Sequence, residues 1–166
     1  MLNNEAKILE KAGAEVLALC TNTMHKVSEP MLEDVSIPFI HIAESTAKQI
    51  TNDGFKKPAL LATKFTMEEE FYISKLTEFG LNPIIPTEKS REILHSVIYD
   101  ELCFNVKTDE SRDKFIGIAL EVQDNEADSV ILGCTEVGML LNSENVKLPV
   151  YDTVVVHCRD IFNSII

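Results

Sequence analysis

Apolar residues along the chain form two kinds of pattern, short continuous runs and longer one-sided stripes. Runs such as 58–62 lack polar alternation, which is typical of parallel strands buried on both faces. Segments such as 111–126 carry apolar residues at helical spacing on one face. The predicted strands are 16–19, 39–42, 58–62, 82–86, 130–132 and 150–153, and the main predicted helices are 1–12, 44–51, 67–79, 90–103, 111–126 and 155–166. Strands that alternate with helices predict an α/β fold, with mostly parallel sheets, helices on both faces and sites at the carboxyl ends of strands.

One ten-residue pattern occurs twice. AEVLALCTNT at 14–23 aligns without a gap with ADSVILGCTE at 127–136, and the alignment places Cys134 opposite Thr21. A second apolar run, directly preceded by a proline, follows each copy at a similar distance, at 39–42 and at 150–153. Such a repeat predicts two pseudo-symmetric α/β lobes whose strand ends meet around one cleft.

The repeat also predicts the boundaries of the lobes. Residues 1–52 and 148–166 are assigned to the first lobe, and residues 53–147 to the second. Only 13 residues precede the first copy, so we expect the first lobe to be truncated at its N-terminus and to lack an opening strand, helix and strand. An uncovered strand edge and apolar face favour self-association, and we therefore expect a homodimer.

Composition narrows the class of protein. The net charge of −12 among 166 residues disfavours nucleic acid as a partner. No apolar run reaches the 18 residues that suggest a membrane span, and the first residues do not resemble a secretory signal. We therefore expect a cytoplasmic protein with no membrane partner. The four cysteines show no metal-ligand spacing, so no metal is predicted and four reduced thiols are expected.

Several short segments together resemble the aspartate/glutamate racemase family. These segments are 20–25 (CTNTMH), 38–42 (PFIHI), 63–68 (TKFTME), 133–136 (GCTE) and 149–153 (PVYDT). The resemblance implies two pseudo-symmetric α/β lobes, no pyridoxal phosphate or other cofactor, and racemisation of an acidic amino acid by one cysteine from each lobe.

The chain departs from that family at three places. Thr21 stands where the family has its first cysteine, and Cys20, one residue earlier, is predicted to face the opposite side of an extended strand. Phe104 matches the position of a family lysine that holds a substrate carboxylate. The glycine-rich loop with which relatives begin has no counterpart.

Racemisation without a cofactor needs a base on one face of the α-carbon and an acid on the other. A thiol can be ionised in a suitable site, whereas a threonine hydroxyl cannot near neutral pH. Cys134 is therefore the main candidate, with a buried core cysteine as the alternative. Thr21 is the second catalytic candidate, but it could equally bind substrate or satisfy a loop amide. The candidate substrate-binding residues are Asn22, Thr23, Thr135, Glu136, Thr63 and Thr66, although Asn, Thr and Glu at such positions also cap or flank helices.

The remaining histidines and cysteines receive structural interpretations. His25, His41 and His157 do not share metal-ligand spacing and are expected to be structural. Cys103 and Cys158 lie on apolar helix faces and are predicted to be core residues.

The leading hypothesis for the function is a cofactor-independent amino-acid racemase impaired by truncation. The alternatives are a catalytically inactive homologue that acts as a binding or structural protein, and a related enzyme with another substrate, such as a hydantoin or maleate.

Overall fold

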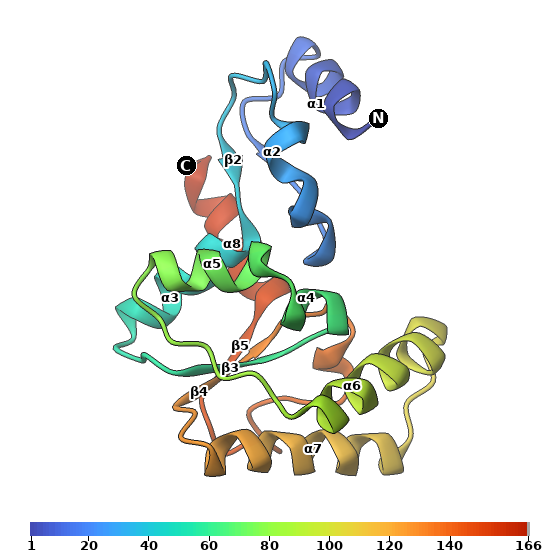
Figure 1. Ribbon diagram of the computed structural model, residues 1–166. Helices are drawn as coiled ribbons and strands as arrows, with labels where there is room; N and C mark the ends of the chain where they lie inside the picture. The colour runs from blue at the N-terminus through green and yellow to red at the C-terminus, as the bar shows by residue number, and fades with distance from the viewer. Residues whose placement is uncertain (166) are drawn as a thin grey trace.

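The computed structural model describes residues 1–165, and it contains two parallel sheets (Figure 1). The smaller sheet pairs β1 (Leu17–Ala18) with β2 (Phe39–Ile40), and the larger has the order β3 (Pro58–Leu61), β4 (Ser129–Leu132), β5 (Val150–Asp152). Every strand pair in both sheets is parallel. The predicted α/β class with parallel sheets is confirmed.

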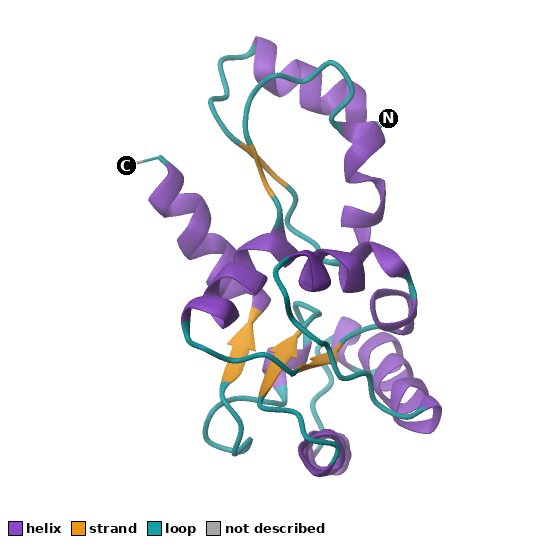
Figure 2. Ribbon diagram, turned by 60° about the vertical axis from the view of Figure 1, so that its left-hand side comes forward, coloured by secondary structure: helices purple, strands orange, loops and turns teal. Residues whose placement is uncertain are grey.

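Helices cover both faces of the larger sheet. Figures 1 and 2 show α3, α5 and α8 on one side of it and α7 on the other. The α-helices are α1 (Leu2–Lys11), α2 (Ser28–Met31), α3 (Ile42–Asn52), α4 (Lys64–Glu68), α5 (Glu70–Glu78), α6 (Glu88–Asp100), α7 (Asp109–Asp124) and α8 (Thr153–Ser164), and the 3₁₀ helices are η1 (Thr23–Val27), η2 (Leu102–Phe104) and η3 (Val137–Met139). Within the described residues, no helix combines the length and apolar character needed to cross a bilayer.

The apolar residues form two separate cores. The main core is built on β3 and β4, whose eight residues are all buried, and it includes Ile50 of α3, Leu76 of α5 and Phe115 of α7. A much smaller cluster, formed by Ala6, Leu17 and Met31 with their neighbours, joins α1 to the small sheet. In Figure 1 this N-terminal part, residues 1–40, projects away from the larger sheet.

Gly133, directly after β4, allows the strands to pack closely. A Cβ atom at this position would lie 2.8 Å from Cδ1 of Leu60, which is too short for a real contact, and 3.0 Å from Cβ of Ala62, which is unusually tight. Any residue other than glycine would therefore displace these neighbouring side chains. The residue that follows, Cys134, is thereby held at a fixed place at the end of β4.

The structure corrects several predicted elements. The helical segment predicted at 67–79 begins earlier, with α4 at Lys64. The helix predicted at 67–79 is interrupted at Glu69, whose backbone is extended (φ −92°, ψ 146°). The strand predicted at 82–86 is reduced to one bridge, between Ile84 and Ala59. The terminal helix begins earlier than predicted, at Thr153, and Ile166, its predicted last residue, lies outside the described part of the chain.

The segment 148–166, predicted to belong to the first lobe, connects the two parts of the molecule. Its strand β5 pairs with β4 in the larger sheet, and its helix α8 packs against α3. Along this segment the boundary of the lobes is therefore less sharp than the repeat suggests. The division of the chain into two lobes stays a prediction.

Candidate functional site

A pocket of about 280 Å³ lies where the carboxyl ends of β1, β3 and β4 converge. Each strand leads into one part of its lining. Seven of the eight predicted site residues line the pocket, namely Thr21, Asn22 and Thr23 after β1, Thr63 after β3, and Cys134, Thr135 and Glu136 after β4. The structure thus brings the two copies of the repeat together.

The eighth predicted residue, Thr66, does not line the pocket itself but contacts two residues that do. Its hydroxyl oxygen is 3.1 Å from that of Thr23 and 3.1 Å from that of Thr63, and the Thr23 and Thr63 oxygens are 3.4 Å apart. Thr63 and Thr66 are buried, and they come from a different part of the sequence than Thr23. Three hydroxyls arranged in a triangle can each donate or accept, so this cluster can adjust its protons to a bound polar group.

Asn22 presents an unused hydrogen-bond acceptor. Its amide nitrogen donates to the Thr153 hydroxyl at 3.1 Å, and that hydroxyl donates its own proton to the Leu132 carbonyl at 2.9 Å. Because the Thr153 proton is already engaged, Asn22 must turn its Nδ2 toward Thr153. Its Oδ1 is then left without a partner, although Asn22 is only 4% exposed. A buried acceptor without a partner is unfavourable unless a ligand supplies the missing donor.

Cys134 and Glu136 form a hydrogen-bonded pair in the segment that follows β4. The thiol donates to Oε2 of Glu136 at 2.9 Å, and the Thr135 hydroxyl donates to the same oxygen at 2.6 Å. Burial, and then the hydrogen bond to Glu136, raise the pKa of Cys134 from 9.0 to about 12. Burial alone would raise the pKa of Glu136, but the two hydrogen bonds outweigh it and lower that pKa. Cys134 is therefore a neutral thiol beside an ionised carboxylate at neutral pH.

His25 stabilises the loop after β1 by hydrogen bonds of its ring. Its Nε2 accepts from the Ile42 amide at 3.2 Å, so its Nδ1 carries the proton and donates to the Thr21 carbonyl at 2.7 Å. His41 and His157 lie nearby, with ring centroids 4.4 Å and 6.1 Å from that of His25. Burial and the neighbouring His41 lower the pKa of His25 to about 4. This ring is a neutral part of the scaffold, in keeping with its structural interpretation.

Four further residues of the lining, which we call the apolar wall, are not among the predicted site residues. They are Met24 of η1, Ile98 and Tyr99 of α6, and Cys103 of η2. Cys103 was predicted to be a core residue, and this was wrong: it is exposed and lines the pocket. Cys158, predicted to be a core residue too, is also exposed, on α8. Phe104, which matches the family lysine, is 75% exposed and does not line the pocket.

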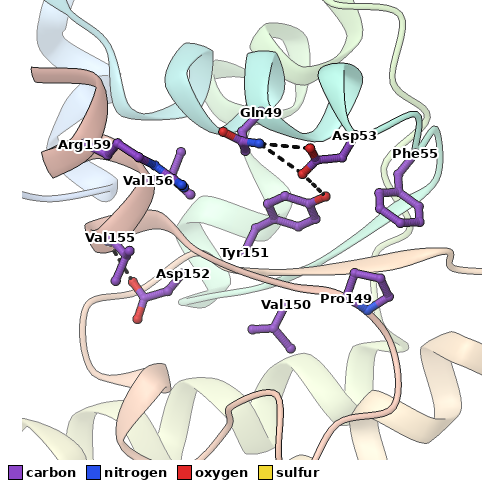
Figure 3. A pocket seen from close by; sticks show the side chains of 10 residues that line it. All are labelled: Gln49, Asp53, Phe55, Pro149, Val150, Tyr151, Asp152, Val155, Val156 and Arg159. Atoms are coloured by element: carbon purple, nitrogen blue, oxygen red, sulfur yellow. Dashed lines mark hydrogen bonds between the residues drawn. The ribbon is translucent and has the colours of Figure 1, made fainter. Parts of the chain in front are cut away.

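A second pocket, of about 420 Å³, lies between the end of α3, the strand β5 and the start of α8 (Figure 3). Several of its polar groups already have structural partners. Asp53 accepts from Tyr151 at 2.8 Å and from Gln49 at 3.0 Å, and Asp152 caps α8 by accepting from the amides of Val154 and Val155. These interactions stabilise the junction of α3, β5 and α8. The pocket between β1, β3 and β4 is thus the better candidate for chemistry.

Comparison with known proteins agrees with the fold. The model of the Asp/Glu/Hydantoin racemase family matches residues 1–161. The chain belongs to this family. It is 26% identical, over 152 residues, to the broad specificity amino-acid racemase RacX of Bacillus subtilis. That match covers 87% of this chain and 62% of RacX, so the chain spans less than two thirds of the length of this relative.

Solved structures of racemase homologues have the same fold. An aspartate racemase homologue from Pyrococcus horikoshii is 33% identical with a TM-score of 0.88, and the match covers 97% of this chain and 71% of that one. A Yersinia pestis protein described as a candidate Asp/Glu racemase is 39% identical with a TM-score of 0.90, and here the match covers 94% of this chain and 68% of the other. The racemase fold thus accounts for nearly all of the chain.

Proposed function

We propose that the pocket between β1, β3 and β4 binds an amino acid and transfers a proton at its α-carbon, as a racemase that needs no cofactor. The observation that carries this proposal is that the half-buried, hydrogen-bonded Cys134–Glu136 pair and Asn22, whose Oδ1 has no partner, line the same pocket. Membership of the racemase family and the printed activity of RacX support it.

The backbone groups of the amino acid have complementary partners in this pocket. The α-ammonium donates to Oδ1 of Asn22, which removes the cost of a buried acceptor without a partner. The α-carboxylate accepts from the hydroxyls of Thr23 and Thr63, whose protons rotate toward it. Thr66 holds both hydroxyls in place from below.

Cys134 acts as the proton-transfer residue, and the substrate itself activates it. In the free protein the thiol keeps its proton, because burial and the Glu136 carboxylate both disfavour a thiolate. An α-ammonium bound at Asn22 adds a positive charge to the same pocket, which stabilises the thiolate and lowers the pKa of Cys134. Glu136 then takes the thiol proton, and the thiolate removes the proton of the α-carbon.

The opposite face of the α-carbon requires a proton donor, and Thr21 is the candidate. Its side chain lines the pocket at the position that the repeat pairs with Cys134. A hydroxyl cannot serve as a base near neutral pH, but it can pass on a proton from water. Return of the proton from this face inverts the centre. Because the thiol is neutral and a threonine stands in place of a second cysteine, the reaction is expected to be slow.

These two features, the neutral Cys134 thiol and Thr21 in place of a second cysteine, favour the alternative of a protein that binds amino acids without turning them over.

The assembly and the compartment of the protein are part of the same proposal. Helix α8 exposes the apolar residues Val155 and Phe162, and Ile165 follows directly after the helix. Each of the three is at least 60% exposed, and a second copy could cover them. We propose a homodimer in the cytoplasm, and light scattering tests the assembly. A monomer at micromolar concentration would contradict it.

The proposed reaction is tested by exchange of the α-proton in D₂O, followed by NMR across a panel of amino acids. Cys134→Ala should abolish exchange. Cys20→Ala is the matched control, because Cys20 is exposed and does not line the pocket, and it should keep most of the wild-type rate. Equal losses in the two variants, or no exchange with any amino acid in the wild type, would overturn the proposal.

A further inference from the structure

The resemblance to aspartate/glutamate racemases implies an acidic substrate, but the lining of the pocket argues otherwise. We infer that the pocket selects amino acids with an uncharged, apolar side chain over aspartate and glutamate. This inference rests on the proposed function, since it concerns the same site. Two features carry it, namely the distribution of charge and the composition of one wall.

Charge disfavours a second carboxylate in this pocket. Among its lining residues, Glu136 is the one charged side chain, and none is a lysine, arginine or histidine. Lys26 and Lys64, which flank the loops, pair with Glu69 at 2.6 Å and with Glu92 at 3.6 Å. A substrate with an acidic side chain would therefore bring a second negative charge close to Glu136 with no cation to offset it.

The lining of the pocket has a polar part and a largely apolar part. Thr23, Thr63 and Asn22 form the part that fits the ammonium and carboxylate shared by all amino acids. The other part is the apolar wall of Met24, Ile98, Tyr99 and Cys103. Met24 and Tyr99 are each 44% exposed, so an apolar ligand side chain would cover apolar surface that now faces water.

The apolar wall is held in place before any ligand arrives. Ile98 is 1% exposed and belongs to the main core. The ring of Tyr99 packs against His95, with centroids 4.7 Å apart, while Nδ1 of His95 accepts from the Lys64 amide at 3.4 Å. At about 280 Å³ the pocket is slightly smaller than the sites of drug-sized ligands, which begin at roughly 300 Å³, and so it suits a single amino acid.

Binding, measured separately from turnover, tests this inference. Titration of ¹⁵N-labelled protein with L-leucine, L-methionine, L-aspartate and L-glutamate should give a Kd at least tenfold lower for the two apolar amino acids. The amide signals of Met24 and Tyr99 should shift as they bind. Aspartate or glutamate binding as tightly as leucine, or no binding by leucine and methionine, would overturn the inference. Binding of leucine without α-proton exchange would instead contradict only the proposed function.

A charge placed in the wall provides a second test. Tyr99→Lys adds a cation at a partly exposed position of the pocket and should shift the ratio of glutamate to leucine affinity at least tenfold toward glutamate. Leu120→Lys is the matched control, because it adds the same charge on α7 at a position that is 45% exposed and outside the pocket. Its ratio should equal that of the wild type. An unchanged ratio in Tyr99→Lys, or an equal shift in both variants, would show that this wall does not select the substrate.

Discussion

Replacing Glu136 with glutamine should make the Cys134 thiol more reactive toward iodoacetamide. The reagent attacks the thiolate, and a pKa of about 12 leaves roughly one thiol in ten thousand ionised at pH 8, against about one in ten at the ordinary value of 9.0. Burial is the largest cause of this shift and remains in the variant. The hydrogen bond to the carboxylate is the next cause, and Glu136→Gln removes its charge.

The size of the effect follows from that hydrogen bond. Hydrogen bonds to charged groups contribute about 1.5–3 kcal/mol, and one pKa unit corresponds to about 1.4 kcal/mol, so the pKa of Cys134 should fall by roughly one to two units. A less basic thiolate attacks more slowly, which cancels about half of the gain on a logarithmic scale. We therefore expect a roughly three- to tenfold faster alkylation of Cys134 at pH 8.

Mass spectrometry of the peptide that contains Cys134 measures this rate, and circular dichroism verifies that the variant is folded. Cys20 and Cys158 are exposed, lie outside the pocket and provide internal references in the same sample. Thr135→Val is the matched control, because it removes the other hydrogen bond to the same carboxylate oxygen and leaves the charge in place. It should not accelerate labelling. A folded Glu136→Gln protein whose Cys134 reacts no faster than in the wild type would refute the assigned pair.

Three further predictions concern the scaffold and the opposite face of the site. Gly133→Ala should lower the free energy of unfolding by about 1–3 kcal/mol, measured by urea denaturation, because its Cβ would lie 2.8 Å from Leu60; an unchanged midpoint would contradict the close packing. The pKa of His25 and that of His41 are lowered from 6.5 to about 4, mainly by burial, so the unfolded state binds more protons in this range and stability should fall as the pH drops from 6.5 toward 4. This fall should be smaller in His25→Gln, and an identical pH dependence would refute the assignment. Thr21→Cys should raise α-proton exchange by placing a thiol opposite Cys134, and an equal or lower rate in the folded variant would remove Thr21 from the proton-transfer position.

The sequence predicts most of the strands in their order along the chain, and it predicts the polar residues that line the pocket, since both depend on local patterns. The continuous apolar runs at 58–62 and 130–132 are specific to buried strands, and β3 and β4 lie there. The internal repeat aligns Thr21 with Cys134, and both line one pocket because the carboxyl ends of β1 and β4, which belong to different sheets, converge there.

The errors have physical causes that only the three-dimensional structure reveals. Cys103 falls on the apolar face if the helix over 90–103 is continuous, but α6 ends at Asp100 and the chain continues as a 3₁₀ helix, which changes the direction of each side chain. The helix predicted at 67–79 is divided at Glu69, where Glu68 pairs with Arg91, Glu69 pairs with Lys26, and the backbone of Glu69 is extended. Ile98 and Tyr99 were missed because the stripe of α6 has the same spacing whether it meets a core or a ligand.

The two separate cores imply that the site can be lost while most of the molecule stays folded. The part of the chain before residue 41 has a small cluster of its own, and it contributes Asn22 and Thr23 to the pocket, whereas Cys134 and Thr63 belong to the larger unit. Segments with few buried apolar contacts open at lower free energy than a main core. Amide exchange in residues 14–31 should therefore report a partial opening that occurs more often than global unfolding. An amino acid that bridges both units would close this opening, so its presence would slow amide exchange in the N-terminal part selectively.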